Sequence, residues 1–78
     1  MTLEERKALV NRFKDAWARK ENWPENWCKT LYIIAASEQA KKHFGTIDAS
    51  LEYVISLINR CENARQVFDK YMPLVEEL

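Results

Sequence analysis

Glycine and proline are scarce in this chain, whose 78 residues include one glycine and two prolines. Folds rich in β-strands need many tight turns, and tight turns favour these two residue types. The scarcity therefore argues against a strand-rich fold. The chain is also short, and either half of it would be too small to bury a core. We predict a single domain over residues 1–78.

An excess of charge of one sign is absent too, because 12 Lys and Arg residues balance 12 Asp and Glu residues. Nucleic-acid-binding domains are usually basic, and proteins that mimic DNA are acidic, so the balance argues against both classes. Apolar residues make up 47% of the chain and charged residues 31%, which is typical of a folded globular domain.

Long apolar runs are missing. The longest run covers residues 31–36 and has six members, whereas a membrane-spanning helix needs about 20. The chain begins with acidic Glu4 and Glu5, where a secretory signal would carry positive charge. We therefore expect a cytoplasmic protein with no membrane partner.

Side chains that perform chemistry are few, comprising two cysteines, Cys28 and Cys61, and one histidine, His43. Their spacing matches no zinc motif, and His43 is more than three helical turns from either thiol along the expected helices. Phosphate-binding and hydrolase motifs are absent. We expect no enzyme activity, no metal and no cofactor, and we interpret both thiols as small buried hydrophobic groups in a reducing compartment.

The first helix is predicted to begin at Leu3, because Thr2 and Glu5 form the T-x-x-E pattern of a capping box. Its apolar residues repeat every three or four positions and form one stripe, which is typical of an amphipathic helix. The stripe consists of Leu9, Val10, Phe13, Ala16 and Trp17.

A second helix is predicted over residues 23–44, with Asn22 as its cap, Pro24 in its first turn and Glu25 reaching back to the cap. Its apolar arc is wide, which favours a central helix packed on two sides. Gly45 then provides the left-handed residue that ends a helix.

A third helical region is predicted to start at Asp48, a good capping residue. The Asn63-x-x-Gln66 pattern would divide this region near residue 62, and Pro73 predicts a kink or stop near Met72. The resulting fold is an all-α, up-down-up bundle of three helices, the third long and, in the alternative, broken near residue 62 into a fourth.

Trp23 gives the main functional indication, since tryptophan is enriched at the energetic centres of protein interfaces. The alternative is that its ring folds back onto Trp27 or Phe13. Our leading hypothesis is a small protein-interaction module, namely a regulator, adaptor or inhibitor of the kind that phages and mobile elements encode. The predicted partner-binding residues are Lys20, Glu21, Trp23, Glu25, Lys41 and Lys42.

Two other functions remain open. Residues 40–50 resemble a helix-turn-helix, and Lys41, Lys42 and His43 together with the first helix would bind nucleic acid. Alternatively, the apolar residues near the end of the chain would form a homodimer. These residues are Phe68, Tyr71, Val75 and Leu78.

Charge is also distributed unevenly along the chain. Residues 1–20 hold six basic and three acidic residues, whereas residues 46–78 hold three basic and six acidic residues. Such opposite charge would pair the first helix with the third, or would steer a partner or a second copy towards the surface.

Overall fold

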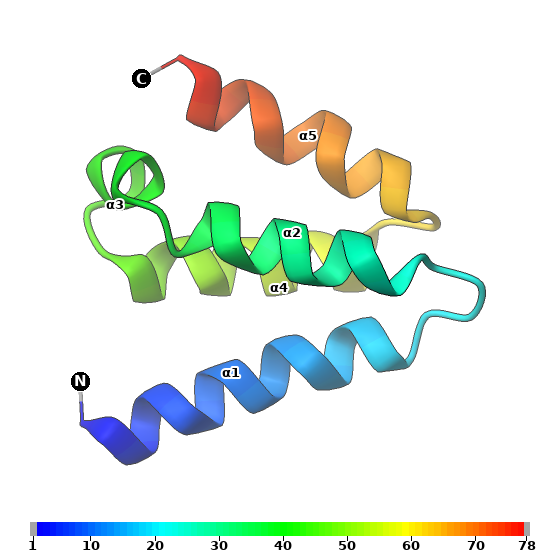
Figure 1. Ribbon diagram of the computed structural model, residues 1–78, viewed down its shortest axis with the longest axis horizontal. Coiled ribbons are helices and arrows are strands. Elements are labelled where there is room, and N and C mark those ends of the chain that lie inside the picture. The colour runs from blue at the N-terminus through cyan, green and yellow to red at the C-terminus, as the bar shows by residue number, and fades with distance from the viewer. Residues whose placement is uncertain (1, 78) are drawn as a thin grey trace.

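The computed structural model describes residues 2–77, which contain five α-helices and no strand (Figure 1). The prediction of an all-α fold is confirmed. The prediction of three helices is wrong, because the second and third predicted helices are each divided into two. The helices are α1 (Leu3–Ala18), α2 (Glu25–Ala35), α3 (Glu38–Phe44), α4 (Ile47–Arg60) and α5 (Ala64–Glu76).

Helix α4 is the centre of the bundle and packs against each of the other four helices. In Figure 1, α2 lies in front of α4, α1 and α5 lie on either side of this pair, and the short α3 lies at one end. Helix α4 buries six side chains: Ser50, Leu51, Val54, Ile55, Leu57 and Ile58. The prediction that residues 23–44 form the central helix is therefore wrong.

The predicted second helix starts later than expected and breaks once. Trp23 precedes a proline, which disfavours helical backbone, so the helix begins only at Glu25, after Pro24. Asn22 does not cap it and instead has a left-handed φ of 64°, which asparagine tolerates. At the break, the Ser37 hydroxyl accepts a hydrogen bond from the Ala40 amide and caps the separate helix α3.

The turn between α3 and α4 is formed as predicted at Gly45, whose φ is 90°. The cap of α4 is Thr46 rather than Asp48, because the Thr46 hydroxyl accepts a hydrogen bond from the Ala49 amide at 3.0 Å. Asp48 lies in the first turn of α4 and pairs with Arg6 of α1.

Helices α4 and α5 are separated where the second capping pattern predicts. The Asn63 side chain accepts a hydrogen bond from the Gln66 amide, and the Gln66 side chain accepts one from the Asn63 amide, which completes a capping box. Pro73 does not stop α5, which continues to Glu76. Proline has no N–H, however, so the Asp69 carbonyl lacks its usual helical donor.

Residues of the last helix pack into their own bundle. Tyr71 is fully buried, and its hydroxyl lies 2.9 Å from the hydroxyl of fully buried Ser50 on α4. Val75 is also buried and Phe68 is half-buried, so this stripe supplies core contacts within the chain. Leu78, which was grouped with these residues in the dimer hypothesis, lies outside the described residues.

The uneven charge of the chain pairs α1 with α4. Arg6 forms an ion pair with Asp48, and Arg12 lies 3.9 Å from Glu52. Both partners of the second pair are well exposed, so its contribution to stability is small. None of the helices in residues 2–77 combines the length and apolar character needed to cross a bilayer.

Candidate functional site

Helix α2 is the most apolar helix of the bundle, yet most of its apolar side chains are only partly buried. Seven of its eleven residues are apolar, but only Leu31 and Ala35 are buried. Ile33 is 68% exposed. The remaining apolar side chains are half-buried, because α1 and α5 pack chiefly on α4 and leave both flanks of α2 partly open. These half-buried side chains are Trp27, Cys28, Tyr32 and Ile34.

One flank of α2 forms a groove of about 380 Å³ against α1, here called the α1–α2 groove. Its floor includes an edge-to-face contact between the rings of Phe13 and Tyr32, whose centroids are 5.5 Å apart. The only charged residues that line it are Lys14 and Lys29. Its full lining, within residues 2–77, is Val10, Phe13, Lys14, Cys28, Lys29, Tyr32 and Ile33.

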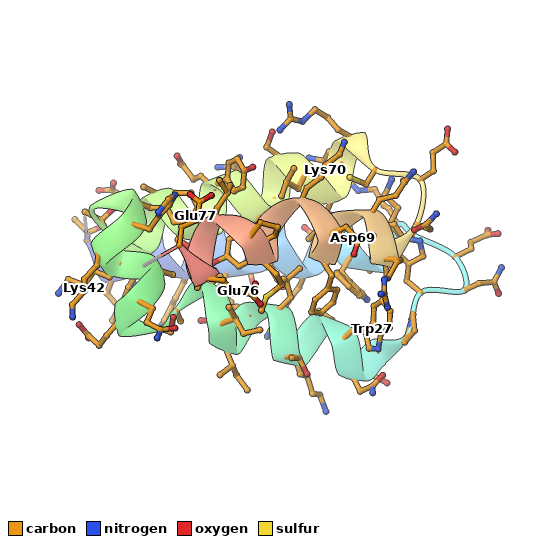
Figure 2. The ribbon with its side chains drawn as sticks, turned by 90° about the horizontal axis from the view of Figure 1, so that it is seen from above. Trp27, Lys42, Asp69, Lys70, Glu76 and Glu77 are labelled. Carbon is orange, nitrogen blue, oxygen red and sulfur yellow. The ribbon has the colours of Figure 1, made fainter. Side chains whose placement is uncertain are left out.

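The other flank forms a groove of about 490 Å³ against α5, here called the α2–α5 groove. It also has an aromatic edge-to-face contact, with the Trp27 and Phe68 centroids 4.9 Å apart. Its rim is mixed in charge, because Arg65 pairs with Asp69 at 3.3 Å while Glu76 lines the same groove. Figure 2 looks onto α5 and shows Trp27 beside the first turns of that helix, with Glu76 further along it.

Cys28 lines the α1–α2 groove and is half-buried, whereas Cys61 is buried as predicted. Burial raises the pKa of the Cys28 thiol, and the nearby Glu25 carboxylate adds to this increase. Lys14 and Lys29 act on the same thiol in the opposite direction. The net increase lowers the thiolate fraction below that of an ordinary cysteine, so the thiol is a weak nucleophile.

Trp23, the predicted anchor, is half-buried in the loop between α1 and α2. Its ring makes an edge-to-face contact with Trp17 at 5.0 Å, rather than with Trp27 or Phe13. The Lys20 ammonium lies 5.3 Å from the centre of the Trp23 ring and donates a hydrogen bond to the Cys61 carbonyl at 2.9 Å. Lys20 therefore joins this loop to the end of α4, and Trp23 packs the loop against α1.

The six predicted partner-binding residues do not form one patch. Glu21 and Glu25 are exposed and lie near Trp23, at the N-terminal end of α2. Lys41 and Lys42 are exposed on α3. Figures 1 and 2 place α3 and Lys42 at the opposite end of the molecule from the loop and Trp27.

The α1–α2 groove was missed by the sequence reasoning, which assigned the wide apolar arc of residues 23–44 to a buried central helix. The exposed lysines at positions 14 and 29 give no signal by themselves, because their common groove depends on how α1 and α2 pack. Within residues 2–77, no group of three or more His, Cys, Asp or Glu side chains is arranged to hold a metal ion.

The geometry thus defines a five-helix bundle with one incompletely covered apolar helix. No protein-family model matches the chain, and comparisons with curated proteins and with solved structures also give no match. The function is therefore inferred from the chain's own surface.

Proposed function

We propose that this chain is a small protein-interaction module, a regulator, adaptor or inhibitor, and that the two open flanks of α2 form its docking surface. The observation that carries the proposal is the contrast between the apolar composition of α2 and its shallow burial, with Ile33 at 68% exposure. Large apolar patches on small proteins mark interaction sites more often than isolated exposed residues do.

Aromatic rings strengthen this proposal. Each flank of α2 contains an aromatic pair that bridges to the neighbouring helix, Phe13 with Tyr32 on one side and Trp27 with Phe68 on the other. Phe13 itself is 1% exposed, but the half-buried rings of Tyr32, Trp27 and Phe68 offer contact area at a low entropy cost, which is the usual character of an interface centre. In the proposal, Trp23 and its polar neighbours Lys20, Glu21 and Glu25 form the edge of this surface.

The competing nucleic-acid function has less support. In a helix-turn-helix, α4 would be the recognition helix, yet it is the helix against which all the others pack. Its exposed side chains are Glu52, Ser56, Asn59 and Arg60. A single basic residue among them gives little attraction for phosphates. Lys41 and Lys42 are exposed on α3, and substitutions of these two residues would test nucleic-acid binding.

The experiment compares two exposed apolar residues that differ in position. Ile33 is 68% exposed beside the α1–α2 groove, and Leu3 is 71% exposed on α1. The tagged wild-type chain and the Ile33→Gln and Leu3→Gln variants are used to capture proteins from a lysate of the source cells, and circular dichroism verifies their folding. We expect Ile33→Gln to lose at least one protein that Leu3→Gln retains. Identical captures by the two variants would contradict the proposal.

A further inference from the structure

The charge around the α1–α2 groove indicates which kind of partner it accepts. We propose that this groove binds an amphipathic helix of another protein, whose apolar stripe is flanked by acidic residues. This inference rests on the proposed function and narrows it to one flank of α2 and one class of partner.

The charged side chains that line the groove are all of one sign. Its lining contains Lys14 on α1 and Lys29 on α2 and no carboxylate. Within residues 2–77, neither lysine takes part in an ion pair. Both ammonium groups act on the thiol of Cys28, as does the Glu25 carboxylate, but Glu25 does not line the groove. Acidic residues on a bound helix would pair with Lys14 and Lys29 without breaking an existing ion pair.

The shape and chemistry of the groove fit an amphipathic helix. The groove runs between two helices, has a volume of about 380 Å³ and is lined by five apolar side chains in addition to the two lysines. Ile33 stands exposed at its edge. An amphipathic helix presents apolar residues at positions i, i+3, i+4 and i+7, and such a stripe is a common occupant of a groove of this kind.

A second copy of this chain fits the groove less well than an acidic helix does. A two-fold contact through the same groove would bring Lys14 and Lys29 of both copies together. Like charges that meet in an interface oppose association. A two-fold copy is therefore disfavoured as the occupant, whereas an amphipathic helix of another protein with acidic flanking residues brings charge opposite to that of the two lysines.

The test uses a displayed library of amphipathic helices with a fixed apolar stripe, in which the flanking positions vary among Glu, Lys and Gln. We expect selection on the wild-type chain to enrich Glu at these positions. Charge reversal with Lys14→Glu and Lys29→Glu should shift the enrichment to Lys and should weaken the Glu-rich helices about tenfold or more. This preference should also diminish with added salt.

The matched control carries Lys41→Glu and Lys42→Glu, which change the net charge equally on exposed residues of α3. This control should keep the preference for Glu. Cys28 reports the location of binding, because a helix in the groove should slow its alkylation. Cys61 is 3% exposed and should not react in either state.

The outcomes separate the two proposals. If helices bind in an Ile33-dependent manner but Glu-rich and Lys-rich sequences bind equally, the acidic class is refuted while the docking surface stands. If no selected helix depends on Ile33 or protects Cys28, both proposals fail at this groove. Two further arms test other occupants, and a positive result in either would overturn the inference. These arms are binding to phosphatidylserine vesicles and self-association of the wild-type chain, measured by light scattering.

Discussion

The buried hydroxyl pair between Ser50 and Tyr71 provides a sharp test of how α4 holds α5. Both side chains have 0% exposure, and their oxygens are 2.9 Å apart. Removal of one hydroxyl leaves the other in a dry interior without this partner, which costs about 1–3 kcal/mol. Removal of both leaves no unsatisfied hydroxyl and should cost much less than the sum of the two single losses.

The perturbation is therefore a double-mutant cycle with Tyr71→Phe, Ser50→Ala and the combined variant. The free energy of unfolding is measured by urea titration with tryptophan fluorescence. We expect each single variant to lose about 1–3 kcal/mol and the double variant to recover at least about 1 kcal/mol relative to the sum. For a domain of this size, about 1 kcal/mol corresponds to a Tm shift of roughly 4–8 °C.

Two control variants separate the hydroxyl pair from other effects of the substitutions. Ser56→Ala lies on an exposed position of the same helix and reports the helix propensity gained when serine becomes alanine. Tyr53→Phe removes the hydroxyl of a half-buried tyrosine on α4. If the losses at Ser50 and Tyr71 simply add in the double variant, the two hydroxyls are not energetically coupled and the reasoning is refuted.

Three further predictions follow from the fold. Burial raises the pKa of Tyr71 above its ordinary value of 10.0, so the unfolded chain loses this proton at a lower pH than the folded chain does. The free energy of unfolding should therefore fall as the pH rises past about 10. Urea titrations should show a smaller fall for Tyr71→Phe. Asn63→Ala removes the side-chain cap of α5 and should cost about 1 kcal/mol in the same assay, whereas an unchanged midpoint would show that the cap is dispensable. In Gly45→Ala the added Cβ would meet no atom within 4 Å, but the residue must keep a φ of +90°. We therefore expect the free energy of unfolding to fall by about 1–2 kcal/mol from backbone strain alone. A fall below about 0.3 kcal/mol would contradict this expectation.

Several helix caps and turns could be predicted from the sequence. Thr2 caps the first helix, Gly45 ends α3, and Asn63 with Gln66 starts α5. These features depend on residues within one turn of each other, so a short stretch of sequence suffices to predict them. The caps at Ser37 and Thr46 depend on equally local residues but were not predicted. The apolar periodicity around Ser37 indicated one continuous helix, and the helix after Gly45 was predicted to start at Asp48 instead of being capped by Thr46.

The extent to which neighbouring helices bury each helix could not be predicted from such local patterns. The apolar arc of residues 23–44 was correctly recognised as wide, but its width measures only how much apolar surface the helix presents. Which helix becomes central depends on the competition among all amphipathic faces for one small interior, and α4 occupies that position. Tertiary packing therefore left α2 half-covered and brought Lys14 and Lys29 to the same groove, since both results depend on contacts between segments far apart in the chain.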